Sequence, residues 1–579
     1  MVQTNRAGKW PSPSSKSMSS VVTGLLASVY LFLGVDAKEA VPVRLGVAPA
    51  GSYLLEQAHI DPLTHPPFFE ALQDLGASVV CYFLRPVTNA GERDSEETRK
   101  QVEAIDSAMR AHGLEYMLDV ELSNFAPRLE VTPGVNEFDH PDGTHHWDPR
   151  MDWLDGVLPP TKPGKPALLS ITYDEIEHMI LSNNKFSNSP KDDYDKPYWL
   201  NTDEMPLTEA YSRLVEIARK VRVEHYQGRV LPQTEQVWPD LFHIFARAGW
   251  IIAPKLLKEH LSSVVMSCAL GAAMQYRDVC GGFWCSPDLW NFDKYPGHSP
   301  ESLRSALQMA YWLGAEILYV ENLDFQGDFK RHPLATPKGS LIAWTDPQHY
   351  ALTNYGRVFR EFAKEYVPNH TRSISWRDYD PRVAIIRLPD GGWGQFSATP
   401  EHGEAASRNR LLGNRAMPLD EAASEWLYVW PILTHGAARP GAISSNNPFI
   451  YPNQVEDFFV PIDSVAVFDH EVGTETLHNV ECMVVCGHAL SAKTFAAVRD
   501  RVGVGAVCII ARRLYEGNTH ETLPGKWVLV DDFRAPAVKE TLDPFLGPPD
   551  VARFRFKHHI VEFRKTGSPD AITAKVRDR

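Results

Sequence analysis

The sequence predicts an α/β protein, with a (β/α)8 TIM barrel over residues 41–378, a smaller α/β domain over 379–540 and a short β tail over 541–579. Eight short apolar runs alternate with amphipathic helical stretches along the first part of the chain. Several of these stretches end in Gly, as helices commonly do. Long Trp-rich insertions, 123–166 and 179–205, follow the third and fourth runs. A strand–helix alternation repeated eight times is typical of a parallel barrel.

The eight apolar runs are the expected barrel strands. In chain order they are VRLGVAP (43–49), SVVCYFL (78–84), YMLDVEL (116–122), LLSITYDE (168–175), RVLPQTE (229–235), WIIAPKL (250–256), GGFWCSP (281–287) and EILYVEN (316–322). Before ESLRSAL, Ser299 is expected to cap a helix whose first residue is Pro300. The stretch SSVVMSCALGAAMQY suits a helix or a strand, so the numbering of strands after the fifth could shift by one.

The first 40 residues predict an export signal. Lys9 and Lys16 precede the apolar segment VVTGLLASVYLFLGV (21–35), and Ala37 is a small residue near a cleavage point. This segment is shorter than the roughly 20 residues that a membrane-spanning helix needs. We therefore expect a secreted or periplasmic protein with no stable membrane span. An uncleaved N-terminal anchor is the alternative.

Charge and cysteine content exclude some classes of protein. The formal net charge is −15, the pI is near 5.8, and no run of Lys and Arg occurs. Nucleic-acid binding needs many basic side chains on one face, so we expect no nucleic-acid partner. The seven Cys residues do not form a disulfide scaffold, although Cys280 and Cys285 are near enough in sequence to pair.

A second α/β unit begins near DPRVAIIRLPDGG (380–392). The runs IDSVAVFDH, VECMVV, VGVGAVCIIA and KWVLVDDF predict further strands, with a helix between the second and third. The last stretch, ARFRFKHHIVEFRKTG, alternates apolar and charged residues and predicts a short antiparallel strand pair. We therefore expect a small doubly wound domain followed by a β tail.

Carboxylates gather at the expected strand ends, where the side chains of a barrel converge on one pocket. They are Asp174, Glu175, Glu235, Asp288 and Glu321. Glycoside hydrolysis needs two carboxyl groups, one that donates a proton and one that attacks or activates water. Aromatic and polar side chains in the same loops would contact the sugar, namely Trp147, Trp238, Trp284, Trp290 and His146.

The alternative interpretation of each acid is an ordinary helix N-cap or a partner of the helix dipole. Glu177 and His178 are assigned to the helical turn that follows the fourth strand. Successive side chains on a strand point to opposite faces, so only one of Asp174 and Glu175 is expected to face the pocket. Glu175 is the first candidate for the general acid, and Glu321, Glu235 and Asp288 compete to be the nucleophile or base.

Other chemistries have weaker support. The loop FDHPDGTHHWDP (138–149) offers zinc or calcium ligands, but its spacing matches no compact site. No GxSxG motif supports a nucleophilic Ser. Cys486 ends a strand of the second unit, but Val484 and His488 stand where an amidotransferase elbow has Gly, so it is expected to be a buried structural residue.

The stretch GHSPESLRSALQMAYWLGAEILYVENLD, continuing through YGRVFREFAKEYV into DPRVAIIRL, resembles the family 42 β-galactosidases and related clan A barrels. The resemblance implies a non-catalytic, flavodoxin- or amidotransferase-like second domain that helps to build a homo-oligomer. It also implies that Glu175 is the acid/base. Clan A enzymes have Asn before this Glu, where this chain has Asp174. Their nucleophile is a Glu ending the seventh strand, where this chain has Asp288; Glu321 takes that place only if the count shifts by one.

Together these observations predict an exported glycoside hydrolase that acts on an oligo- or polysaccharide and needs no cofactor. The first alternative is a carbohydrate-binding barrel that does not hydrolyse its ligand, in which the acids would not face one another across a pocket. The second is a metal-dependent hydrolase that uses the loop 138–149.

Overall fold

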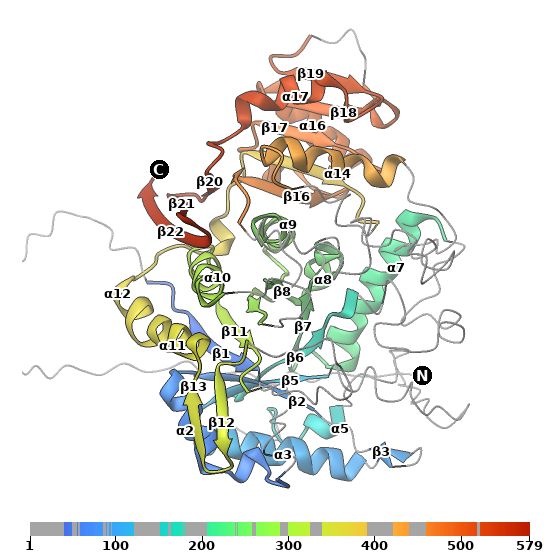
Figure 1. The fold of residues 1–579 in the computed structure, drawn as a ribbon. Coiled ribbons are helices and arrows are strands. Elements are labelled where there is room, and N and C mark those ends of the chain that lie inside the picture. The colour runs from blue at the N-terminus through green and yellow to red at the C-terminus, as the bar shows by residue number, and fades with distance from the viewer. Residues whose placement is uncertain are drawn as a thin grey trace, which may run out of the picture. The chain divides into compact units, whose positions relative to one another are not determined.

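A computed structural model describes most of the chain after residue 39 (Figure 1). The described residues are 40–48, 55, 58–84, 88–89, 92–93, 95–120, 151–159, 162, 164–177, 180, 205–237, 239, 241–257, 262–289, 299–324, 339–390, 421–438, 459–517 and 522–579. The predicted export signal and the loop 138–149 lie outside them. Within these residues, no helix is long and apolar enough to cross a membrane.

The first part of the chain forms a parallel barrel, which confirms the predicted fold class. Its strands are β1 (Arg44–Ala48), β2 (Val79–Phe83), β5 (Glu115–Asp119), β6 (Leu168–Asp174), β7 (Leu231–Gln236), β8 (Ile251–Leu256), the pair β9 (Gly282–Phe283) and β10 (Ser286–Pro287), and β11 (Ile317–Glu321). They pair in the order β10-β8-β7-β6-β5-β2-β1-β11. A parallel bridge between Cys285 and Leu318 brings the two ends of this sheet together.

Helices connect and surround these strands. They include α2 (Pro66–Leu75), α3 (Ser95–Ala111), α7 (Leu207–Lys220), α8 (Phe242–Ala248), α9 (Ser262–Gln275) and α10 (Pro300–Trp312). The Ser299 hydroxyl accepts a hydrogen bond from the Ser302 amide, which confirms the predicted cap of α10. The ambiguous stretch is the helix α9, so the strand count does not shift and β11 is the eighth strand.

The barrel interior is filled by side chains that alternate along the strands. Ile251 and Ala253 of β8 belong to a buried interior cluster, together with Trp284 and Ile317. A second, larger apolar cluster lies between the strands and the helices. Because side chains alternate with a period of two, Lys255 continues the inward-facing row of β8.

The second part contains a five-stranded parallel sheet formed by β14 (Val383–Arg387), β16 (Val465–Asp469), β17 (Cys482–Val485), β18 (Val507–Ala511) and β19 (Lys526–Val530). The order β16-β14-β17-β18-β19 is the doubly wound arrangement of flavodoxin-like domains. The helices α14 (Glu421–Leu433), α16 (Ala492–Gly503) and α17 (Pro536–Leu542) accompany it. The predicted domain boundaries at 378 and 540 stay predictions.

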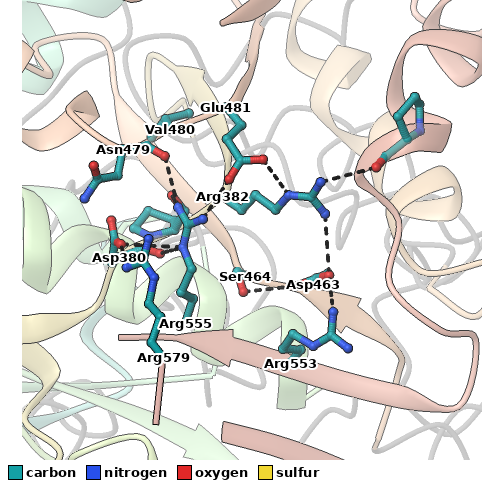
Figure 2. A network of polar contacts seen from close by, with 12 residues as sticks. Asp380, Arg382, Asp463, Ser464, Asn479, Val480, Glu481, Arg553, Arg555 and Arg579 are labelled. Atoms are coloured by element: carbon teal, nitrogen blue, oxygen red, sulfur yellow. Dashed lines mark hydrogen bonds and ion pairs between the residues drawn. The ribbon is translucent and has the colours of Figure 1, made fainter. Parts of the chain in front are cut away.

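The C-terminal tail is larger than the strand pair that the sequence predicts. β20 (Val551–Arg555), β21 (His559–Thr566) and β22 (Ser568–Asp578) are antiparallel, and β15 (Ile462–Asp463) pairs with β20 in parallel. Arginines of the tail bind carboxylates near the parallel sheet (Figure 2). The third strand, β22, was missed although Ile572, Ala574 and Val576 alternate with polar residues in it.

Barrel and second sheet contact each other through α9 and the edge strand β16. A Cβ atom added to Gly271 would lie 2.2 Å from the Val467 carbonyl oxygen, so a larger residue there would force the two elements apart. Asp469, at the end of β16, accepts a 2.5 Å hydrogen bond from the Tyr211 hydroxyl and another from the Gln275 amide. The barrel thus covers one edge of the second sheet.

The seven cysteines are all buried and free. The suggested pairing of Cys280 with Cys285 is therefore wrong: Cys285 lies in the barrel wall, where its Sγ is 3.5 Å from the Pro254 carbonyl oxygen. Burial raises the pKa of the Cys486 thiol well above its ordinary value, and the nearby Glu425 carboxylate adds to this. A thiol in that state is a poor nucleophile, in agreement with its predicted structural role.

Candidate active site

Five carboxylates meet at the carboxyl ends of the barrel strands, around the ammonium group of Lys255. Their distances to Lys255 Nζ are 2.7 Å for Glu321 Oε2, 2.8 Å for Asp174 Oδ1, 3.2 Å for Glu175 Oε1, 3.6 Å for Glu235 Oε1 and 3.9 Å for Asp288 Oδ2. These are the five acids that the sequence analysis singled out. The structure therefore brings all the candidate catalytic carboxylates together.

Strand register explains this convergence. In the parallel sheet Asp174 lies beside Glu235, so their side chains leave neighbouring strands at the same level. Lys255 lies beside Ser286 on the next pair of strands, and Glu321 ends the eighth strand. Side chains at one level of a closed barrel point to its axis, where a long lysine can reach all of them.

Asp174 and Glu175 both reach Lys255, although a regular strand would allow only one of them to do so. The reason is the backbone of Glu175, whose φ is +49°, in the left-handed region. Its amide still donates a 2.7 Å hydrogen bond to the Glu235 carbonyl oxygen. The strand alternation therefore stops at Asp174, and the expectation that only one of the two acids faces the pocket is wrong.

Two more strand ends have the same rare backbone conformation. Leu257 follows β8 with φ +73°, and Asn322 follows β11 with φ +76°. A bulky residue in this region costs roughly 1–3 kcal/mol, and such residues concentrate at functional sites. The strands that carry Glu175, Lys255 and Glu321 all end in this way.

The site is buried and has more acids than bases. Lys255 is 3% exposed and Glu321, the most exposed of the acids, is 7% exposed. Among the described residues Lys255 is the one cation in contact with the five carboxylates. Several buried carboxylates of like charge cannot all ionise without a large cost, so part of the cluster must hold protons.

The pKa values follow from this charge balance. Burial, with the nearby charges of Asp174 and Glu321, raises the pKa of Glu235 to about 8, although Lys255 opposes the shift. Burial alone would lower the pKa of Lys255, but the surrounding carboxylates outweigh it and raise that pKa well above its ordinary value. Lys255 is therefore an ammonium ion at neutral pH, and Glu235 holds a proton.

A buried hydrogen-bond chain supports Glu235 from below. The Tyr319 hydroxyl donates a 2.5 Å hydrogen bond to Glu235 Oε2, and the Gln233 amide donates to the same hydroxyl. Gln233 Oε1 in turn accepts hydrogen bonds of 3.2 Å from Ser170 and Thr172. This chain fixes the orientation of one acid of the cluster.

Two residues near the site were not identified from the sequence. Lys255 lies in the apolar run WIIAPKL, where a buried charge was itself a signal, since lysine is almost never fully buried without a partner. Asp119 ends β5, is 4% exposed and lies 3.9 Å from the Cys81 sulfur. It stands at a strand end like the other acids and could have been found in the same way.

The remaining candidates lie in other places. Trp284 is 4% exposed and belongs to the barrel interior cluster. Trp147, Trp238, Trp290 and His146 lie outside the described residues, as does the loop 138–149. In the described part of the chain, no group of three His, Cys, Asp or Glu side chains is arranged to hold a metal ion. Glu177 accepts a 2.6 Å hydrogen bond from the Val237 amide, which anchors the turn after the fourth strand.

Comparison with solved structures finds similar folds in several glycoside hydrolases. A cold-adapted β-galactosidase from Rahnella sp. R3 is 10% identical, with 93% of this chain and 98% of that chain covered and a TM-score of 0.53. A GH42 β-galactosidase from G. stearothermophilus is 11% identical, with 90% and 92% covered and a TM-score of 0.48. An exo-β-1,4-mannosidase from Opitutaceae bacterium strain TAV5 is 11% identical, with 94% and 87% covered and a TM-score of 0.44.

No protein-family model matches the sequence, and no curated protein matches it. At 10% identity, the likeness to the Rahnella enzyme establishes the fold alone, a (β/α)8 barrel followed by a smaller α/β domain. That fold confirms the resemblance drawn from the sequence. What the site does must be argued from its own residues.

Proposed function

We propose that the protein is a glycoside hydrolase that cleaves an oligo- or polysaccharide with a pair of buried carboxylates. The observation that carries the proposal is the convergence of five carboxylates from four strands within 4 Å of one ammonium group. Such a site offers both protonated and ionised carboxyl groups at neutral pH, which is what glycoside hydrolysis needs. The fold shared with glycoside hydrolases agrees with the proposal.

Glu175 and Glu321 are the proposed pair. Lys255 Nζ donates hydrogen bonds of 3.2 Å to Glu175 Oε1 and 2.7 Å to Glu321 Oε2. Two oxygens this close to one nitrogen are at most about 6 Å apart, below the roughly 6.5–9.5 Å of inverting enzymes. The separation favours a retaining mechanism and argues against a binding barrel in which the acids lie far apart.

In the proposed reaction, Glu175 donates its proton to the glycosidic oxygen while Glu321 attacks the anomeric carbon. The bond to the leaving oxygen breaks, and a covalent ester forms between the sugar and Glu321. Glu175, now ionised, then takes a proton from water, whose oxygen attacks the same carbon and releases Glu321. Each carboxylate returns to its starting state, so no cofactor is consumed.

Asp288 is the competing nucleophile. It follows the seventh strand, where clan A enzymes place their nucleophile, whereas Glu321 ends the eighth. Asp288 Oδ2 is 3.9 Å from the ammonium group, against 2.7 Å for Glu321 Oε2. The closer contact favours the ionised form of Glu321, and for this reason Glu321 is preferred.

The test is hydrolysis of a panel of aryl glycosides by the wild type and by Glu175→Gln, Glu321→Gln, Asp288→Asn and Glu235→Gln. We expect Glu175→Gln and Glu321→Gln to lose turnover on whichever glycoside the wild type cleaves. Azide should restore turnover to Glu175→Ala with retention of configuration, and to Glu321→Ala with inversion. The proposal fails if the folded wild type cleaves no member of the panel. If the wild type binds sugars but does not hydrolyse them, the protein is a carbohydrate-binding barrel.

Export is proposed on the basis of the segment 21–35, and assembly through the second domain on the basis of the family resemblance. An exported enzyme would meet polysaccharides outside the cytoplasm. Mass analysis of the mature N-terminus should show cleavage near residue 38, and light scattering should give a mass that is a multiple of the chain.

A further inference from the structure

We infer that Lys255 is a positioning residue, which holds Glu321 ionised and facing Glu175 by donating a hydrogen bond to each. The inference rests on the proposed function, since it assigns a role to the lysine in that same pair. Its ammonium group has three N–H donors, and the two acids it bonds are the ones on which the proposed reaction depends.

The position of Lys255 makes a role in simple fold stability a poor explanation. A buried ion pair contributes little net stability when both charges must leave water, and here five acids surround one base. A lysine within 4 Å of five acids instead has the means to divide them into ionised and protonated members.

Distance determines that division. The ammonium group is nearest to Glu321, so it favours the charged form of that acid most. Glu235 is farther away, at 3.6 Å, and holds its proton, as its raised pKa indicates. The other titratable groups that face the cluster are Glu175 and Asp288, with Asp119, Tyr319 and Cys81 on the neighbouring strands.

The test variant is Lys255→Met, which removes the charge of the side chain and keeps its approximate length. An opposite charge at this distance lowers the pKa of a carboxyl group by roughly 1–3 units. Removing the charge of Lys255 should therefore shift the acid limb of the pH profile of kcat/KM to higher pH by about the same amount. We expect kcat to fall at least about tenfold at the wild-type optimum, with KM changed less. Lys255→Arg keeps the charge and should keep the acid limb near its wild-type pH.

A matched control is Lys162→Met, in the same barrel. Lys162 also binds a buried carboxylate, that of Asp106, but Arg110 binds Asp106 as well, at 2.9 Å. This variant should show wild-type kcat and an unmoved acid limb. If Lys255→Met also keeps both, the lysine is merely structural and the inference is wrong.

A second measurement does not depend on turnover. NMR titration of 13C-labelled carboxyl groups should show Glu321 ionised to low pH in the wild type and titrating at higher pH in Lys255→Met. If this shift occurs but the wild type cleaves no glycoside, the role of the lysine stands and the proposed function falls. If glycosides are cleaved but the titration is unchanged, the function stands and the inference falls.

Should Lys255→Met not fold, the double variant Lys255→Met/Asp174→Asn removes one buried negative charge together with the cation. It should fold more readily, because one less uncompensated charge is buried. The same shift of the Glu321 titration is expected in it, relative to Asp174→Asn alone. An unchanged titration in this pair would overturn the inference.

Discussion

Two charged networks in this molecule differ in their ratio of acidic to basic side chains. In the barrel, five carboxylates surround one lysine. Between the tail and the second sheet, five arginines meet four carboxylates in a chain of shared contacts, part of which Figure 2 shows. Its members are Arg382, Arg553, Arg555, Arg577, Arg579, Asp380, Asp463, Glu481 and Glu562.

The difference indicates what each network is for. In the tail, positive and negative groups nearly balance, and Arg555 also bonds the carbonyl oxygens of Pro381 and Asn479. Such a network stabilises the contact between two sheets. In the barrel, buried carboxylates of like charge repel one another and lower stability, so their retention points to chemistry. Removing one member should therefore have opposite effects on stability in the two places.

The largest effect is expected from Glu175→Gln in the barrel. Loss of a general acid typically costs 10²–10⁴ in rate, so turnover should fall by about 10³, equivalent to about 4 kcal/mol of activation free energy. The free energy of unfolding should stay about equal, because the proposed proton donor is neutral in the resting enzyme and a neutral amide of similar shape replaces it. Kinetics on the best aryl glycoside and urea unfolding measure the two quantities, and a variant that loses stability together with activity would contradict the comparison.

The next effect is expected from Arg555→Leu in the tail. Arg555 donates 2.8 Å hydrogen bonds to Glu481 and to the Asp380 carbonyl oxygen. Their loss leaves partly buried acceptors unpaired, which should lower the free energy of unfolding by about 2–3 kcal/mol while the folded protein keeps its turnover. Arg564→Ala, which breaks an exposed pair with Asp550, is the matched control and should cost less than about 1 kcal/mol. Equal losses in the two variants would show that the network adds nothing beyond a surface pair.

A further effect concerns pH. The pKa of Glu235 is raised in the folded state to about 8, so its proton favours folding fully below the unfolded pKa, near 4.5. This contribution is lost as the pH rises from about 4.5 to 8, at no more than about 1.4 kcal/mol per pH unit. Glu235→Gln should flatten the fall in unfolding free energy across this range. Parallel pH curves for the two proteins would refute the assignment.

The smallest effect is expected from Asp288→Asn. Asp288 Oδ2 lies farthest from the ammonium group among the five contacts, at 3.9 Å, so Lys255 stabilises its charge least. Removing that charge should raise the free energy of unfolding by about 1 kcal/mol, as relief of like-charge repulsion does. Thermal unfolding of the variant checks this, and a clear loss of stability would mean that Asp288 belongs to a balanced pair.

The barrel and the acids of the site could be predicted because they depend on local pattern and on topology. Eight apolar runs give eight strands, and parallel strands bring their carboxyl ends to one face. For this reason Glu175, Glu235 and Glu321, which are far apart in the chain, were expected together. The cap at Ser299 could be predicted from local sequence alone.

What could not be predicted depends on long-range contacts. Lys255 gains its partners from residues 66 and 80 positions away, and a single lysine in an apolar run indicates that partners exist but does not identify them. The joint approach of Asp174 and Glu175 depends on one backbone angle, held by a bond to the neighbouring strand. The alternation of side chains between the two faces holds only for a regular strand. The site lies at the strand ends, where the backbone is no longer regular.

The central claim, that Glu321 is the nucleophile of a retaining site centred on Lys255, has a direct test. The wild type is incubated with 2-deoxy-2-fluoroglycosyl fluorides that match the aryl glycosides it cleaves, and the labelled peptide is located by mass spectrometry. The account predicts one covalent adduct per chain, on Glu321, and none in Glu321→Gln. An adduct on any residue other than Glu321, or no adduct on a protein that cleaves the matching glycoside, would contradict it.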